Sequence, residues 1–251
     1  MKQLILLSLL VLVACTIIAC KTNKQNTSSK DKAGGSVENS LDTGNIISMS
    51  KGACYGTCPI YTMTIYKNGA IHFFGKRFCA MIGPRVAQLS NEQIEDLTQD
   101  ISDIKFETFP DKFESMIADL PSTELTFYRA DSSAKSIWWN MNEPEQLLNL
   151  STKLDSYRST LDWKIDKDAP LPKGAIGHQI TTYLNDGIDA YDFVKEFSAY
   201  DLVPKKEIQA GQNYWLFEFD TDKITPYEMM DLLIRSDKTQ DTRFNTKVSE
   251  R

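Results

Sequence analysis

The sequence offers little material for several common kinds of active site. It contains only two histidines, His72 and His178, far apart in the chain, which leaves little basis for a histidine-based triad or a zinc site. It has no Gly-x-x-x-x-Gly-Lys phosphate loop and no Gly-x-Ser-x-Gly nucleophile motif. The formal charge is −6 and no basic stripe occurs, which argues against a nucleic-acid partner. We therefore expect a non-enzymatic protein without a cofactor or a bound metal.

The N-terminal residues predict a lipoprotein leader. Met1-Lys2 precedes an apolar run, Leu4 to Ala19, which is too short and too weakly flanked by charge to be expected as a transmembrane anchor. Ile17-Ile18-Ala19-Cys20 resembles the bacterial lipobox, in which the cysteine is diacylated and becomes the new N-terminus. The resemblance implies a signal peptide over residues 1–19 and a lipid on Cys20.

A second lipobox-like sequence ends at Cys15. We favour Cys20, because the chain turns polar directly after it, whereas cleavage before Cys15 would leave four further residues, mostly apolar, ahead of the polar segment. An ordinary secretory peptide and an uncleaved anchor are the alternatives. Residues 20–44 are then a flexible tether, since the segment after Cys20 is rich in Lys, Asn, Ser, Thr and Gly. We expect attachment to a membrane of the bacterial cell envelope, and to the outer membrane because no aspartate follows Cys20.

Residues 45–162 predict an α+β domain with a mainly antiparallel sheet. Asn68-Gly69 predicts a type I′ hairpin turn, because both central residues of that turn must tolerate positive φ. Ser90 and Gln93 predict a capping box at the start of one helix, and Pro144 suits the first turn of another. Strands are expected at 45–49, 61–66, 70–75, 77–82, 123–129 and 135–139.

One motif in this first domain carries a family resemblance. Cys54-Tyr55-Gly56-Thr57-Cys58-Pro59-Ile60-Tyr61, followed by Tyr66-Lys67-Asn68-Gly69, resembles the start of an uncharacterised bacterial lipoprotein family, domain of unknown function 6438. The resemblance covers about residues 45–162. It implies no activity.

Of the five cysteines, two belong to the leader and three, Cys54, Cys58 and Cys79, to the folded part of the chain. In an oxidising envelope Cys54 and Cys58 can close a small loop, and we favour this structural disulfide. The alternatives are a redox pair, although a strand rather than a helix follows, and a metal site completed by Cys79 and His72. Cys79 is then either a buried small hydrophobe or the true partner of one of the two.

A polar, proline-containing linker, residues 163–174, precedes a second expected domain at 175–251. Thr225, Pro226 and Glu228 predict another capped helix start. The expected order of elements is β-α-β-β-α-β, the split order of ferredoxin-like domains. The elements are strand 177–184, helix 188–200, strands 202–209 and 214–219, helix 226–235 and strand 242–248. The chain is thus expected to hold two small α+β domains.

The second domain resembles the N-terminal propeptide of subtilisin-type proteases. The residues that carry the resemblance are Asn213 to Asp220 and Asn245 to Arg251. In that family the sheet packs on the protease and the tail enters the active-site cleft as a product-like inhibitor. The resemblance implies that Ser249, Glu250 and Arg251 contact a subtilisin-like protease in trans, as an inhibitor or a folding chaperone.

Three hypotheses about function follow from the sequence. We favour a lipid-anchored, non-enzymatic protein of the cell envelope that binds another envelope protein. The second hypothesis is a trans-acting inhibitor or chaperone of a subtilisin-like protease. The third is an envelope thiol-redox protein that uses Cys54 and Cys58.

Overall fold

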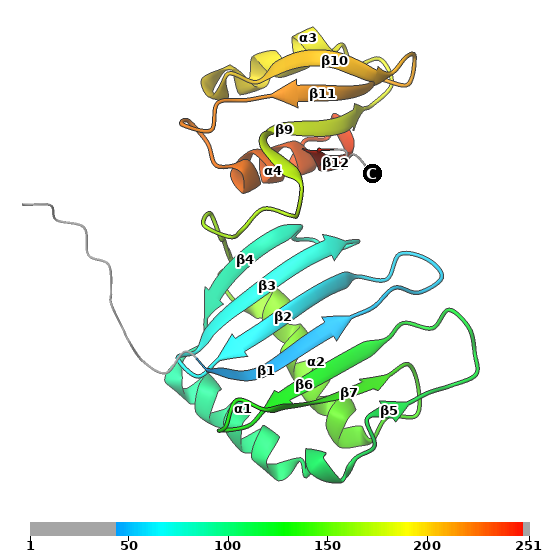
Figure 1. Ribbon diagram of the computed structural model, residues 1–251, viewed down its shortest axis with the longest axis vertical. Helices are drawn as coiled ribbons and strands as arrows, with labels where there is room; N and C mark the ends of the chain where they lie inside the picture. Colours follow the sequence, from blue (N-terminus) through cyan, green and yellow to red (C-terminus); the bar gives the residue numbers. More distant parts are fainter. Residues whose placement is uncertain (1–43, 248–251) are drawn as a thin grey trace, which may run out of the picture. The chain divides into compact units, whose positions relative to one another are not determined.

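The chain folds as an α+β protein with two sheets, seen in a computed structural model that describes residues 44–247 (Figure 1). The leader, the tether and both candidate lipidation residues, Cys15 and Cys20, lie outside the described residues, as do Ser249, Glu250 and Arg251. Within the described range, no helix is both long and apolar enough to cross a bilayer.

The first sheet has eight strands in the order β5-β7-β6-β1-β2-β3-β4-β8. All neighbours pair antiparallel except β5 and β7, which are parallel. The strands are β1 Asn45–Lys51, β2 Ile60–Tyr66, β3 Ala70–Arg77, β4 Gly83–Gln88, β5 Lys112–Phe113, β6 Thr123–Tyr128, β7 Ala134–Trp139 and β8 Lys164–Ile165. The last of these lies in the predicted linker and pairs with β4.

Two helices, α1 (Asn91–Asp103) and α2 (Glu145–Thr160), bury side chains against one face of this sheet, and Figure 1 shows α2 behind the strands. A short 3-10 helix, η1 (Phe106–Thr108), follows α1. The burial of β1 and β2 alternates along each strand, as expected when one face is covered. The predicted capping box of α1 is present, with Ser90 and Gln93 each satisfying the other's backbone N–H, and Pro144 is the N-cap of α2.

The second sheet has four antiparallel strands in the order β10-β11-β9-β12. They are β9 Ala175–Leu184, β10 Val203–Gln209, β11 Tyr214–Glu218 and β12 Thr239–Thr246. The helices are α3 (Ala190–Phe193), the 3-10 helix η2 (Val194–Tyr200) and α4 (Pro226–Arg235). α4 begins with the predicted capping box of Thr225 and Glu228. This sheet has its own core, which includes Phe193, Phe217 and Leu233.

Besides the strand in the predicted linker, three differences between the structure and the predicted elements have local causes. The β2–β3 hairpin is present, but only Gly69 of the Asn68-Gly69 pair has positive φ, so the turn is not type I′. Gly69 N donates to Tyr66 O, so residues Tyr66–Gly69 form one turn. Gly69, the last residue of that turn, lies in the left-handed region. The connection is a three-residue loop, and the positive φ falls on its last residue alone.

The other two differences also have local causes. The strand predicted at 77–82 is wrong: β3 ends at Arg77, Phe78 takes a φ of 55°, and the next strand starts only at Gly83. β4 was not expected because it opens with Gly83-Pro84, residues that disfavour strands. The helix predicted at 188–200 is one turn of α-helix followed by a 3-10 helix with a kink at Phe197.

Arg85 of β4 is the most deeply buried charged side chain on the first sheet, with 3% of its surface exposed. Its guanidinium NH2 donates to Asp231 Oδ1 of α4. The other oxygen of this carboxylate, Oδ2, forms an ion pair with Arg235, whose Nε lies 2.9 Å away. A buried arginine and an exposed one therefore share a single aspartate.

Candidate binding site

Four loops meet at one end of the first sheet, and we call this the loop end: residues 52–59, 78–82, 114–122 and 140–144. Sheet register places them together: Lys51, where β1 ends, pairs with Tyr61, the second residue of β2, and with Thr123, where β6 begins. Backbone bonds join two of the loops: Gly52 N donates to Ser122 O at 2.9 Å, and Tyr55 N donates to Asp119 O at 3.0 Å. The family-like motif at 54–61 therefore forms part of a composite surface.

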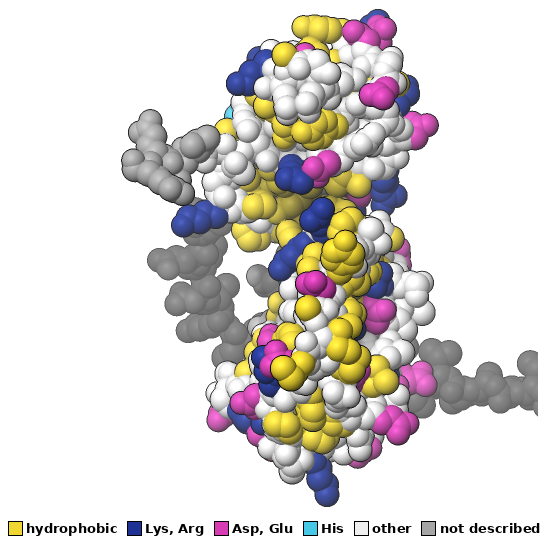
Figure 2. All heavy atoms as spheres, turned by 90° about the vertical axis from the view of Figure 1, so that its right-hand side faces the viewer, with side chains coloured by type: hydrophobic (Ala, Val, Ile, Leu, Met, Phe, Trp, Pro, Cys, Tyr) yellow, Lys and Arg dark blue, Asp and Glu magenta, His cyan; other side chains and the backbone are white. Residues whose placement is uncertain are grey.

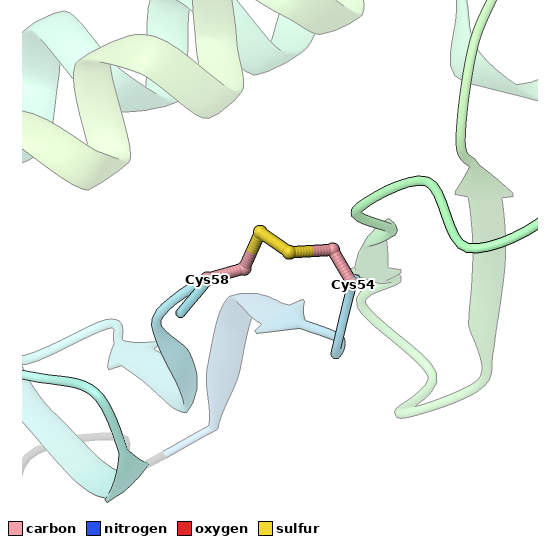
Figure 3. Close-up of a disulfide and its surroundings, with 2 residues drawn as sticks. All are labelled: Cys54 and Cys58. Carbon is pink, nitrogen blue, oxygen red and sulfur yellow. A yellow bond between two sulfur atoms is a disulfide. The ribbon is translucent and has the colours of Figure 1, made fainter. Parts of the chain in front are cut away.

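A disulfide closes the loop between β1 and β2. Cys54 and Cys58 are bonded with their Cα atoms 5.7 Å apart, joining the chain that leaves β1 to the chain that approaches β2 (Figure 3). Both cysteines are partly buried, whereas Tyr55 between them is 90% exposed. The bond shortens the free part of the loop and restricts the positions its exposed side chains can take.

Exposed hydrophobic side chains gather at the loop end. The described residues include nine exposed large hydrophobics, and six of these lie in the four loops or in the first turns of α2. The six are Tyr55, Phe78, Met116, Ile117, Met141 and Leu148. Figure 2 faces this end of the first sheet and shows hydrophobic side chains grouped between charges of both signs. The turns at the opposite end, 67–69 and 129–133, contribute none of the nine.

The covered face of the sheet becomes polar in its last row, next to the loops. In the preceding row the neighbouring residues Leu125, Met49 and Met63 are apolar and fully buried. In the last row Thr123, Lys51 and Tyr61 stand side by side. The polar row leaves a cavity of about 320 Å³ between the sheet, the loops and α2. Its wall includes Lys51, Cys58, Pro59, Tyr61, Pro121, Trp139, Glu143, Asp155 and Arg158.

A network of hydrogen bonds occupies one side of this pocket. The Tyr61 hydroxyl donates to Asp155 Oδ1, and Arg158 NH1 donates to the same oxygen at 2.7 Å. The Arg158 guanidinium also lies over the Tyr61 ring, 4.8 Å from its centroid. Burial alone would raise the pKa of Asp155, but the bonds from Tyr61 and Arg158 outweigh it and lower that pKa. Burial and the bond to Asp155 raise the pKa of the Tyr61 hydroxyl well above its usual range.

Lys51 forms the other side of the pocket. Its ammonium group donates to Thr123 Oγ1 at 3.0 Å. Burial lowers the pKa of Lys51, and the partial compensation by Asp155 and Glu143 does not restore it. No carboxylate in the described part of the chain lies within ion-pair distance of this nitrogen. A half-buried cation is thus held by one neutral hydroxyl.

The remaining cysteine is separate from the pocket and the disulfide. Cys79 is free and half-buried, and its thiol donates to Ile60 O and Arg77 O, each at 3.3 Å. Burial raises the pKa of the Cys79 thiol, which is the opposite of what a reactive thiolate needs. Over residues 44–247, no group of three or more His, Cys, Asp or Glu side chains could hold a metal ion, so Cys54, Cys58, Cys79 and His72 do not form such a group.

Sequence reasoning located the loop and missed the pocket behind it. Lys51 could have indicated a polar site, because it is a charged residue on the same face of the alternating strand β1 as the inward-facing Ile47 and Met49. Arg158 could have done the same, since it lies one helical turn after the buried Leu154. The sequence does not reveal that these two cations, more than a hundred residues apart, line one cavity.

Comparison with known families covers this part of the chain. Residues 45–158 match the family described as Domain of unknown function (DUF6438). The match supports the resemblance drawn from the cysteine motif, and its range includes Lys51, Tyr61, Asp155 and Arg158. No curated protein and no solved structure matches the chain. The pocket and the disulfide loop therefore both belong to the segment that the family describes.

Proposed function

We propose that this protein is a lipid-anchored, non-enzymatic module of the bacterial cell envelope, and that it binds a partner protein through the loop end. The observation that carries the proposal is the gathering of six of nine exposed large hydrophobics around one disulfide-closed loop. Contiguous exposed apolar surface on a soluble domain commonly marks an interaction site, and loops held by a rigid sheet are where binding residues concentrate. Tyr and Met are also enriched at protein interfaces.

The test is site-specific photo-crosslinking in living cells. A photoreactive residue replaces Met116, which is fully exposed at the loop end, or Val203, which is 44% exposed at the start of β10. We expect one discrete crosslinked partner from position 116 and none from position 203. Equal products from both positions, or none from position 116, would contradict the loop end as the binding surface.

The lipid anchor is a separate part of the proposal and rests on the lipobox-like sequence. Replacing Cys20 with serine is expected to abolish incorporation of a clickable fatty acid and to release the protein from the membrane fraction. Replacing Cys15 with serine is the control and should leave both unchanged. If only the Cys15 variant lost the label, Cys15 and not Cys20 would be the lipidated residue. Outer-membrane location is tested by fractionating the same cells.

A second proposal concerns residues 175–251. Their elements run β9, α3 with η2, β10, β11, α4 and β12, which supports a ferredoxin-like domain in the split β-α-β-β-α-β order. This order hosts many functions, so the likeness to protease propeptides remains a proposal about Ser249, Glu250 and Arg251. It predicts that the full chain inhibits a subtilisin-like protease of its own cell and that removing these three residues restores proteolysis.

A further inference from the structure

The pocket at the loop end has cationic hydrogen-bond donors that the protein leaves unused. The ammonium of Lys51 has three donors and gives one to Thr123 Oγ1. The guanidinium of Arg158 has five donors, and one is bonded to Asp155 Oδ1 at 2.7 Å. Both groups line the same cavity of about 320 Å³. A partly desolvated cation gains most from an anion that enters beside it, since the local dielectric is below that of water.

The opposite charges in the pocket are not equally available. Asp155 accepts from both Tyr61 and Arg158, so its charge is already compensated. Glu143 also lines the cavity and faces Lys51 without forming an ion pair with it among the described contacts. A ligand therefore meets the ammonium of Lys51 and the unused N–H donors of Arg158, whose charge Asp155 balances. It is opposed by the carboxylates of Glu143 and Asp155, which both act on Lys51.

The remaining wall favours an anion that carries an apolar body. Pro59, Pro121, Trp139 and Leu148 line the cavity, and Leu148 is 46% exposed. The outer surface around the opening has further exposed hydrophobics, Tyr55 among them. A peptide segment with an acidic group fits this combination of two cationic donors and apolar contacts better than a bare inorganic anion does.

We propose that the pocket binds a peptide carboxylate, placed between Lys51 and Arg158 when the partner docks on the loop end. This inference rests on the proposed function, because the partner supplies the peptide. Arg158, already oriented by Asp155 and by the Tyr61 ring, would donate from its free nitrogens. Lys51 would exchange a single neutral contact for a charge-assisted one, and the carboxylate of Glu143 would oppose the binding.

The interaction has a defined pH dependence. Lys51 attracts a carboxylate only in its protonated form. Burial lowers the pKa of this lysine below its usual 10.5. The groups that face it do not titrate in the same window: the pKa of Asp155 is lowered, and those of Tyr61 and Arg158 are raised. Affinity should therefore fall with rising pH at values where an ordinary lysine still keeps its proton.

The experiment is calorimetric titration of the full-length, detergent-solubilised protein with N-acetyl-leucine, which mimics a peptide end. N-acetyl-leucinamide, without the carboxylate, and inorganic phosphate are the comparison ligands. For a ligand of this size we expect a dissociation constant in the millimolar range, and binding of the amide at least about tenfold weaker. Lys51→Met should weaken the binding of N-acetyl-leucine by about tenfold or more, whereas Glu143→Gln should strengthen that binding by about threefold. Lys195→Met, at an exposed lysine on η2, should change nothing.

The outcomes separate this inference from the proposed function. Equal binding of acid and amide, tighter binding of phosphate, or weaker binding after Glu143→Gln would each overturn the carboxylate site. The carboxylate site would also be overturned if N-acetyl-leucine did not bind at a concentration roughly a hundred times the expected dissociation constant. In all these cases crosslinking from position 116 would still decide the loop-end proposal by itself. Because Glu143→Gln predicts a gain, a folding defect cannot imitate the expected result.

Discussion

Replacing Arg85 with alanine should lower the free energy of unfolding by about 3–5 kcal/mol, because it leaves a carboxylate without its buried partner. Arg85 is 3% exposed and the Asp231 side chain 14% exposed, so water cannot readily replace the lost guanidinium. The measurement is urea unfolding of the full chain, followed by tryptophan fluorescence and circular dichroism.

The same aspartate provides the control for that experiment. Arg235 contacts Asp231 Oδ2 at 2.9 Å, but its own side chain is 69% exposed. Replacing Arg235 with alanine should change the free energy of unfolding by no more than about 1 kcal/mol, as is usual for exposed ion pairs. Similar losses for the two arginine variants would mean that burial does not set the strength of this contact.

Replacing Tyr55 with alanine should weaken binding of the crosslinked partner by roughly thirtyfold or more, the loss of about 2 kcal/mol expected for a tyrosine hot spot. Tyr55 is 90% exposed at the tip of the disulfide-closed loop, so the substitution removes contact area without disturbing the core. The measurement is the dissociation constant of the complex with the purified partner.

Tyr191 is the matched control for Tyr55. It is also an exposed tyrosine, at 61%, but it lies on α3 beside the second sheet. Replacing Tyr191 with alanine should leave the dissociation constant unchanged, and the unfolding curves of both variants should match that of the unmodified protein. A larger loss of affinity from Tyr191 than from Tyr55 would place the partner on the second sheet.

Local sequence signals predicted most of the regular elements. The capping boxes at Ser90 and Thr225 marked the starts of α1 and α4, because each needs only a hydroxyl residue and a Gln or Glu three positions later. The alternation in β1 and β2 likewise needs only a dozen neighbouring residues. In such segments the local preference and the tertiary structure agree.

Prediction failed where tertiary pairing overrides local preference. β4 opens with Gly83-Pro84 and includes the charged Arg85, a poor strand by composition, yet it pairs with β3 and β8. The short strand β8 lies in a segment that looks like a linker. The pocket was not predicted for a related reason. Lys51 and Tyr61 lie on the first two strands, whereas Asp155 and Arg158 lie on a helix that begins almost a hundred residues later.

Hydrogen exchange of the full-length protein, with and without the crosslinked partner, measures directly whether the loop end is the binding surface. It reports the backbone of every described segment at once. On binding, we expect slower exchange in residues 52–59, 114–122 and 140–144, and no change in the turns 67–69 and 129–133 at the opposite end of the same sheet. Protection confined to those turns or to the second sheet, with the loop end unchanged, would mean that the partner does not bind at the loop end.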